Sequence, residues 1–197
     1  GSVIGKVIVS HPDFAGFHFT GSTATFNTIW RQIGEHLGAY KSYPRIVGET
    51  GGKNFIFAHP SAPADEVAAA IVRGAFEYQG QKCSAGSRAY IPVSLWKEVK
   101  ERVGDMLKEI KTGDVRDFTN FVNAVIDETS FDNIMGYIEH ARQAPDAEIL
   151  FGGKGDKSVG YFVEPTVILT TNPAFKTMTE EIFGPVITIY VYEDHAY

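Results

Sequence analysis

Apolar residues along the chain follow two patterns, a helical spacing and short continuous runs. Apolar side chains at i, i+3 and i+4 share one face of a helix. This spacing predicts helices over residues 22–36, 63–78, 95–110 and 127–142. Short runs rich in β-branched and aromatic residues are typical of strands. They predict strands over residues 14–20, 45–48, 54–58, 88–93, 148–151 and 186–192. Segment 3–9 fits either state, and the alternation of strands and helices favours an α/β fold.

The helical spacing also defines an inward face for the predicted helices. In the first helix this face consists of Phe26, Ile29, Trp30, Ile33 and Leu37. In the second it consists of Val67, Ala70, Ile71, Ala75 and Tyr78. In the fourth it consists of Phe131, Ile134, Met135 and Ile138. Ser94 is the predicted N-cap of the third helix, because a serine oxygen accepts hydrogen bonds from first-turn N–H groups.

Composition and charge narrow the class of protein. The chain has 197 residues, 44% hydrophobic and 13% aromatic, which is enough for a packed core. Its formal net charge of -6 argues against a nucleic-acid binder, which needs clustered positive charge. No apolar run approaches the roughly 20 residues of a membrane-spanning helix, and no signal-peptide pattern is present. A single cysteine excludes an internal disulfide and fits a reducing compartment.

Cys83, the only cysteine, is a candidate nucleophile. A lone cysteine is most often a small buried hydrophobic residue. Residues 80–87, however, read Gly-Gln-Lys-Cys-Ser-Ala-Gly-Ser, a polar junction between a predicted helix and a predicted strand. A loop of this kind exposes the sulfur, and the adjacent Lys82 favours the thiolate, which is the reactive form.

Glu49 follows the predicted strand over 45–48 and precedes Thr50-Gly51-Gly52. Such a residue can be an ordinary solvated carboxylate, but open α/β sheets also bind ligands at the carboxyl ends of their strands. The glycine pair is not a phosphate-binding P-loop, because Val47 and Asn54 stand where that motif needs glycine and Ser or Thr.

Two further motifs indicate a cofactor site. Residues 19–23, Phe-Thr-Gly-Ser-Thr, predict a strand, a turn and a helix start, whose N–H groups can hold a pyrophosphate. Ser22 fits equally well as an ordinary N-cap. Residues 180–186, Glu-Glu-Ile-Phe-Gly-Pro-Val, form an acidic turn before a strand. The chain has no GxGxxG fingerprint, and no HExxH or CxxC pattern that indicates a metal site.

Together these four motifs resemble the aldehyde dehydrogenase superfamily. They follow that family's order, with Phe-Thr-Gly-Ser at 19–22, Glu-x-Gly-Gly-Lys at 49–53, Gly-Gln-x-Cys at 80–83 and Glu-Ile-Phe-Gly-Pro at 181–185. Residues 160–166 are also similar to the family's Gly-Tyr-Phe-x-x-Pro-Thr segment. The resemblance covers nearly the whole chain and implies an aldehyde dehydrogenase-like α/β fold. It implies the end of a Rossmann-type NAD-binding domain over 1–52, and most of the α/β catalytic domain, truncated at its C-terminus, over 53–197.

The resemblance implies a role for each motif residue. Cys83 is expected to attack the aldehyde and form a thiohemiacetal, which becomes a thioester when hydride passes to the nicotinamide, and Glu49 to activate the hydrolytic water. The N–H of Cys83 is expected to form half of the oxyanion hole, and Ser84 to help hold the substrate carboxylate. The residues expected to contact NAD are Gly21, Ser22, Thr23, Ala24 and Thr25 at the pyrophosphate, Thr50, Gly51 and Phe183 at the nicotinamide, and Glu181 at its ribose.

The finer resemblance is to the Δ1-pyrroline-5-carboxylate dehydrogenase family, which oxidises L-glutamate γ-semialdehyde to L-glutamate in proline breakdown. Residues 11–16, 43–52, 76–85 and 123–128 carry it. Gly86 departs from the pattern, because a bulkier Cys or Ala is typical there. The resemblance implies an NAD-dependent homo-oligomeric enzyme, cytoplasmic in bacteria and in the mitochondrial matrix in eukaryotes, with a small aldehyde as substrate and no nucleic-acid or membrane partner.

The resemblance further implies that the chain is a middle fragment of its parent. Family members carry an oxyanion-hole Asn and an adenosine-ribose Lys upstream, and a substrate-carboxylate loop and an oligomerisation flap downstream. We therefore expect the chain to be inactive alone. Two other interpretations stay open: a dehydrogenase of another aldehyde, and a non-catalytic dehydrogenase-like protein with a structural or binding role.

Overall fold

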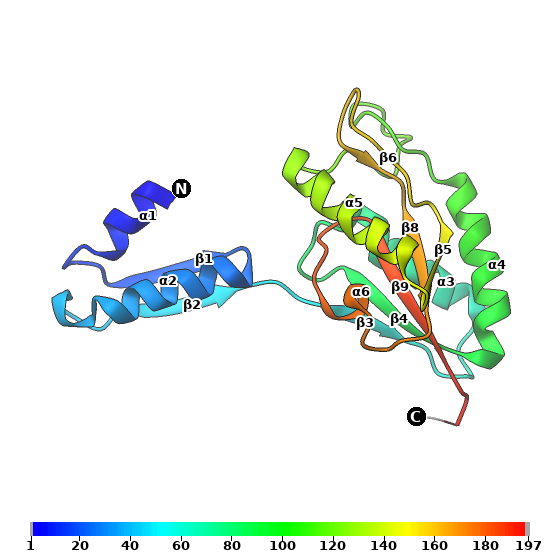
Figure 1. Cartoon of the computed structure of the whole chain (residues 1–197), viewed down its shortest axis with the longest axis horizontal. Coiled ribbons are helices and arrows are strands. Elements are labelled where there is room, and N and C mark those ends of the chain that lie inside the picture. The colour runs from blue at the N-terminus through cyan, green and yellow to red at the C-terminus, as the bar shows by residue number, and fades with distance from the viewer. Residues whose placement is uncertain (1, 196–197) are drawn as a thin grey trace. The chain divides into compact units, whose positions relative to one another are not determined.

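The computed structural model in Figure 1 describes residues 2–195. Gly1, Ala196 and Tyr197, at the outer ends of the two predicted domains, lie outside the described residues. The chain divides into two compact units, Gly1–Gly52 and Lys53–Tyr197. That the first belongs to an NAD-binding domain and the second to a catalytic domain stays a prediction.

The first unit is built around two parallel strands. Strands β1 (Gly16–Thr20) and β2 (Arg45–Glu49) pair in register from Gly16 and Arg45 to Thr20 and Glu49. Parallel pairing needs a crossover, and helix α2 (Thr23–Glu35) supplies it, followed by a short 3₁₀ helix, η1 (Leu37–Ala39). The ambiguous segment 3–9 is helical, within α1 (Ser2–Val9).

The predicted inward face of α2 is only partly correct. Ile33 is buried and forms a small core with Val9 and Phe14. Trp30, however, is 57% exposed, and Leu37, which is 49% exposed, lies beyond the helix in η1. A sheet of two strands covers only a narrow strip of a helix, so the apolar stripe is wider than the surface that this unit offers it.

The second unit contains a five-stranded sheet in the order β3-β4-β9-β8-β5. Its strands are β3 (Asn54–Phe57), β4 (Gly86–Pro92), β9 (Val186–Tyr192), β8 (Thr166–Thr170) and β5 (Ala147–Phe151). Neighbouring strands pair in parallel except β5, which is antiparallel to β8. The prediction of an α/β fold is confirmed.

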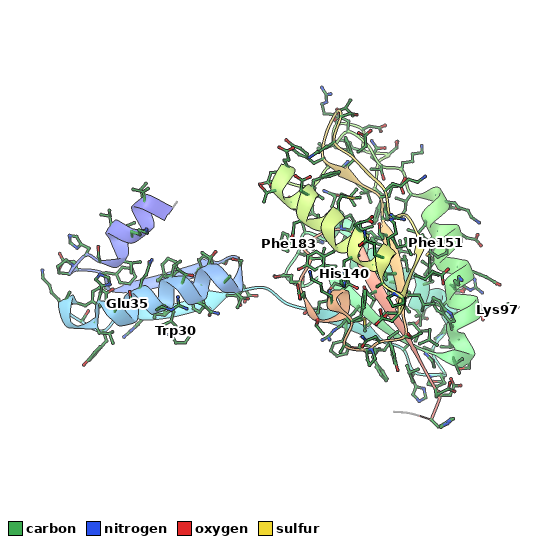
Figure 2. The ribbon with its side chains drawn as sticks, in the orientation of Figure 1. Trp30, Glu35, Lys97, His140, Phe151 and Phe183 are labelled. Carbon is green, nitrogen blue, oxygen red and sulfur yellow. The ribbon has the colours of Figure 1, made fainter. Side chains whose placement is uncertain are left out.

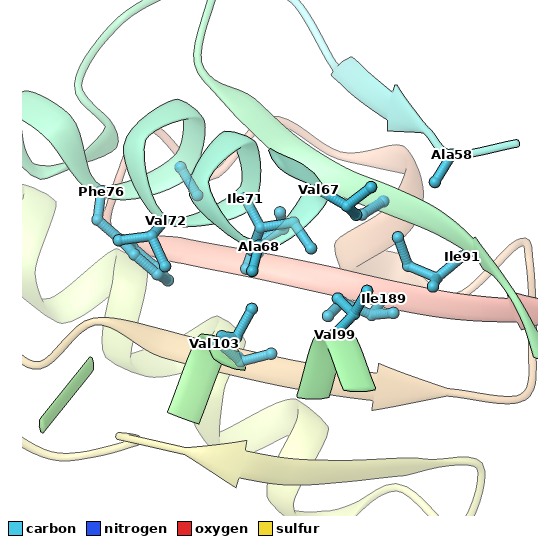
Figure 3. Packing of buried hydrophobic residues seen from close by; sticks show 14 of the residues in the cluster. Ala58, Val67, Ala68, Ile71, Val72, Phe76, Ile91, Val99, Val103 and Ile189 are labelled. Carbon is cyan, nitrogen blue, oxygen red and sulfur yellow. The ribbon is translucent and has the colours of Figure 1, made fainter. Parts of the chain in front are cut away.

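Helices cover both faces of this sheet (Figure 1). Helices α3 (Ala64–Phe76) and α4 (Val93–Glu109) pack on one face, and α5 (Glu128–Gln143) and α6 (Lys176–Thr179) on the other. A 3₁₀ turn, η2 (Glu77–Gly80), follows α3, and strands β6 (Gly155–Asp156) and β7 (Phe162–Val163) form a short hairpin. Figure 3 shows the first core, to which α3, α4 and the strands contribute Val67, Ala68, Ile71, Val72, Phe76, Ile91, Val99, Val103 and Ile189.

Several predictions for this unit need correction. Helix α3 ends at Phe76, so Tyr78 lies beyond it and is 64% exposed; Ala70 is exposed as well. Ser94 is not an N-cap, because α4 begins one residue earlier at Val93. Instead, the Ser94 N–H donates to Oδ1 of Asp194, 3.1 Å away, so a carboxylate distant in sequence caps the helix. Strand β8, helix α6 and the β6–β7 hairpin were not predicted.

Within residues 2–195, none of the helices has the length and apolar character needed to cross a bilayer.

Candidate active site

The predicted site residues of the second unit all lie where strands begin. Cys83 and Ser84 precede β4, and Glu181 and Phe183 precede β9. Strands β3, β4 and β9 are adjacent and parallel. Loops that precede adjacent parallel strands meet at one edge of the sheet, which we call the amino edge. The topology therefore gathers two motifs that are about 100 residues apart in sequence.

The backbone just before Cys83 has an unusual conformation. Tyr78, Gln79 and Gly80 all have left-handed backbone, with φ of 53°, 57° and 64°. A turn follows, in which the Ala85 N–H donates to the Lys82 carbonyl at 3.1 Å. Cys83 is exposed and its thiol is free. The predicted exposed junction is thus present, and a buried structural cysteine is excluded.

Lys82 has a partner of its own. Its Nζ lies 3.0 Å from Oε2 of Glu77, and Arg73 lies 3.1 Å from Oε1 of the same carboxylate. The hydrogen bond and the charge of Lys82 lower the pKa of Glu77. Because Glu77 compensates the charge of Lys82, the predicted influence of Lys82 on the Cys83 thiol is weakened.

The nucleophile loop touches the motif before β9 at two glycines. A Cβ on Gly80 would lie 2.3 Å from the Gly184 carbonyl oxygen and 2.8 Å from that of Ala75. A Cβ on Gly184 would lie 2.5 Å from Cδ1 of Ile134. Neither position has room for a side chain, and Gly80 also has positive φ, which L-residues rarely adopt. The absence of a side chain at Gly80 therefore allows the two loops to approach each other, whereas its absence at Gly184 leaves room for Ile134 of α5.

Phe183, in the loop before β9, combines an unusual backbone conformation with an exposed side chain. Its φ is 57° and its side chain is 43% exposed, at the surface of the second unit in Figure 2. A bulky residue in left-handed backbone is unusual and tends to occur at functional sites. The neighbouring Glu181 is half-buried. An exposed aromatic face beside a half-buried carboxylate suits a flat heterocycle that carries a hydroxylated sugar.

Tyr137 and Lys176 anchor the residue before Glu181. The Tyr137 hydroxyl donates to Oε2 of Glu180 at 2.7 Å, and Lys176 Nζ lies 4.9 Å from the centroid of the tyrosine ring. Burial, together with the Glu180 carboxylate, raises the pKa of Tyr137 to about 12. Tyr137 therefore stays a hydrogen-bond donor at neutral pH and holds the start of the Glu181–Phe183 loop.

Lys53 is a charged residue that the sequence-based prediction missed. Its Nζ is buried and, within the described residues, has no hydrogen-bond partner; Nε of Arg88 is in the same situation. Burial and the charge of Arg88 lower the pKa of Lys53 to about 8, against the opposing effect of Glu181 and Glu180. From the sequence alone, a lysine that follows two glycines is expected to be solvated. In the structure, Lys53 lies before β3, beside the loops that precede β4 and β9, and places a positive charge near Glu181.

The first unit holds the other predicted residues. The Gly21 N–H donates to the Glu49 carbonyl at 3.1 Å, which ties the turn after β1 to the end of β2. Ser22 is the N-cap of α2 and accepts from the Thr25 N–H at 3.2 Å. Residues 21–25 are exposed, and the N–H groups of Thr23 and Ala24 have no acceptor within the helix. Both interpretations of Ser22, N-cap and anion-binding turn, are therefore compatible.

The predicted site residues thus fall into two groups. Gly21, Ser22, Thr23, Ala24, Thr25, Glu49, Thr50 and Gly51 belong to the first unit, and Cys83, Ser84, Glu181 and Phe183 to the second. Glu49 is exposed at the carboxyl end of β2. Among residues 2–195, no group of histidine, cysteine or acidic side chains could hold a metal ion.

The comparisons with known proteins define the class. The family model described as the aldehyde dehydrogenase family matches residues 1–196. The chain belongs to the aldehyde dehydrogenase family, and the resemblance predicted from its four motifs is confirmed.

Two of its relatives share a narrower name. The chain is 57% identical over 196 residues to the mitochondrial Δ1-pyrroline-5-carboxylate dehydrogenase of Dictyostelium discoideum, covering 98% of the chain and 35% of that protein. It is 48% identical over 198 residues to the human protein of that name, covering 100% of the chain and 35% of that protein.

Solved structures agree with this. The crystal structure of Δ-pyrroline-5-carboxylate dehydrogenase from Mycobacterium tuberculosis bound with NAD superposes with a TM-score of 0.90 and 45% identity. The match covers 97% of this chain and 34% of that chain. The chain spans about a third of the length of these relatives.

Proposed function

We propose that the chain is a segment of an NAD-dependent dehydrogenase that oxidises L-glutamate γ-semialdehyde to L-glutamate in proline breakdown. The observation that carries this is the meeting of the exposed Cys83 loop with the Glu181–Phe183 loop at the amino edge of β4 and β9. The identity to enzymes of that name, along nearly the whole chain, supports the substrate.

The proposed reaction uses residues from both groups. Sγ of Cys83 forms a bond to the aldehyde carbon, and the carbonyl oxygen receives a hydrogen bond from the Cys83 N–H. Loss of hydride from that carbon leaves a thioester on Cys83. Glu49 takes a proton from water, which attacks the thioester and releases the carboxylic acid and the thiol. Ser84, exposed beside the nucleophile, donates to the carboxylate of the substrate.

The residues present fit NAD, which accepts the hydride when bound. The N–H groups over residues 22–25 suit a pyrophosphate, because a helix N-terminus attracts anions. Glu181 accepts from ribose hydroxyls, and the exposed ring of Phe183 offers a face to the nicotinamide. Thr50 and Gly51 follow Glu49 directly and contribute backbone near the same ring.

A chimaera tests the proposal. The chain replaces the matching segment of the Dictyostelium relative, and reduction of NAD is followed with glutamate semialdehyde as substrate. We expect activity that Cys83→Ser lowers by at least about 10³-fold, because a serine hydroxyl is much less acidic than a thiol and is a poor nucleophile at neutral pH. A chimaera in which Cys83→Ser keeps its activity would exclude the mechanism and favour a structural role for the chain.

Substrate choice is tested in the same chimaera. An aliphatic aldehyde that lacks the carboxylate is expected to react with a much lower kcat/KM than glutamate semialdehyde, because it cannot pair with the polar carboxylate site. A preference for the plain aldehyde supports the alternative, a dehydrogenase of another aldehyde. The parent enzyme is expected to be homo-oligomeric. If it is eukaryotic, it is also expected to be mitochondrial, as the names of two relatives state for themselves.

A further inference from the structure

The backbone that leads to Cys83 is strained. Tyr78 and Gln79 are consecutive non-glycine residues with φ of 53° and 57°. Left-handed backbone is unfavourable for residues that have a Cβ. Surrounding contacts must therefore hold this turn in place, and the two glutamines on either side of Gly80 supply them.

Gln79 is buried, with only 6% of its surface exposed. Its Oε1 accepts from the Asn123 N–H at 3.1 Å, and its Nε2 donates to the Ala124 carbonyl at 3.4 Å. A buried carboxamide satisfied by backbone groups on both ends fixes the orientation of its side chain. The left-handed residue Gln79 is thus tied to a segment 44 residues away.

Gln81 repeats the arrangement on the other side of Gly80. Its Oε1 accepts from the Ile126 N–H at 2.9 Å. Both glutamines therefore bind the same short stretch, Asn123–Ile126, with Gly80 between them against the Gly184 carbonyl.

The Asn123–Ile126 stretch has its own supports. Nδ2 of Asn123 donates to the Gly113 carbonyl at 2.9 Å, and the Val125 N–H donates to the Tyr161 carbonyl at 2.9 Å. Val125 is 3% exposed within the second core. The stretch is held independently of the nucleophile loop and can act as its fixed reference.

We propose that Gln79 and Gln81 are positioning residues for Cys83, which set the direction of its sulfur and N–H by clamping the Gly80 turn to Asn123–Ile126. This inference rests on the proposed role of Cys83. The loop is held at one end by the two glutamines and at the other by β4, which starts at Gly86. Cys83 lies between these two anchors, and neither glutamine needs to touch substrate.

The chain itself provides the test, because Cys83 is its only thiol. The rate of alkylation by iodoacetamide, measured against pH, reports on Cys83 alone. Gln79→Met and Gln81→Met keep the side-chain length and remove the hydrogen bonds. Gln143→Met is the matched control, because Gln143 is exposed on α5 and its side chain donates to Glu139 of the same helix.

We expect each loop variant to shift the alkylation rate by about threefold or more, toward the rate of the urea-unfolded chain. Amide hydrogen exchange separates the two clamps. In Gln79→Met the Asn123 amide should exchange about tenfold faster, as for the loss of one net hydrogen bond, with Ile126 unchanged. In Gln81→Met the Ile126 amide should change instead. Gln143→Met should change neither measurement.

Folded loop variants that alkylate with the wild-type rate and pH profile overturn the inference. If a methionine variant loses its native circular dichroism, the asparagine variant at that position is measured with the same expected shifts, since its amide is one methylene short of its partners. Failure of the proposed function is a separate result, because it appears as Cys83→Ser activity in the chimaera and leaves the alkylation data unaffected.

Discussion

Gly80 and Gly86 flank the nucleophile loop and differ in the space around them. A Cβ on Gly86 would have its nearest neighbour, Cδ1 of Ile56, at 3.5 Å, an ordinary contact. At Gly80 it would lie 2.3 Å from a backbone oxygen, in left-handed backbone. Gly86→Ala should raise the free energy of unfolding by about 0.5–1 kcal/mol.

Gly80→Ala should lower the same free energy by about 2 kcal/mol or more, because the backbone itself must move. Urea denaturation of the two variants is the measurement. Equal stabilities would mean that the Gly80–Gly184 approach is not as close as described. A Cβ fits at Gly86, which agrees with the bulkier residue that the family pattern has at this position.

Lys53 should make the stability of the second unit depend on pH. Its pKa is about 8 in the folded chain and about 10.4 in an unfolded one. Between these values the unfolded chain binds a proton that the folded chain does not, so stability rises with pH across that range. Below pH 8 the cost of the buried charge is fully present.

Lys53→Met should therefore raise the free energy of unfolding at pH 7 by about 1–3 kcal/mol, and the gain should shrink above about pH 10. Unfolding by urea at both pH values tests this, with Lys97→Met on the exposed surface of α4 as the control (Figure 2). A loss of stability at pH 7 would show that Lys53 is held mainly by attraction to Glu181 and Glu180.

At the scale of elements, helix α4 depends on a cap that comes from the far end of the chain. Asp194 accepts from the Ser94 N–H, and hydrogen bonding by the Ser94 side chain and N–H lowers the pKa of Asp194. A carboxyl group with a lowered folded pKa stabilises above its unfolded value, about 3.9, and loses that effect as the pH falls through the folded value.

Asp194→Ala should lower the midpoint of thermal unfolding at pH 7, and the difference from wild type should vanish at pH values well below 4. The exposed neighbour Glu193→Ala serves as the control. A pH-independent difference would assign the effect to something other than the carboxylate cap.

The observed elements also show which features hydrophobic spacing predicts and which it does not. Strand β9 was predicted over its observed residues, 186–192, because a continuous buried run leaves little choice. The end of α3 was predicted two residues too late, because Tyr78 keeps the helical spacing while its backbone turns left-handed. The cap of α4 could not be predicted, since its partner is 100 residues away.

At the scale of the molecule, the motifs predicted the candidate site residues but not how they are gathered. Nothing in the spacing of Cys83 and Glu181 gives the strand order β3-β4-β9, and that order is what brings their loops together. Lys53, Gln79 and Gln81 were missed as site residues for the same reason. Their importance lies in contacts with distant segments and not in their sequence neighbours.

The proposed mechanism requires residues from both units, and Glu49→Gln separates their contributions. In the chimaera, acylation of Cys83 should persist while hydrolysis slows by about 10²–10⁴-fold, because the general base is lost. Rapid mixing should show a burst of NAD reduction close to the enzyme concentration, followed by a slow steady state. A variant without a burst would place Glu49 in the acylation step instead.

The proposed site residues of the second unit lie on the side of the sheet where the parallel strands start. The connections on the opposite side, such as residues 58–63 after β3 and 171–175 after β8, carry none of the proposed site residues. Peptide tags or reporter groups introduced there should leave Cys83 reactive. The same separation leaves these connections free to vary in length between related enzymes, while the loops that precede β4 and β9 must keep both their length and their glycines.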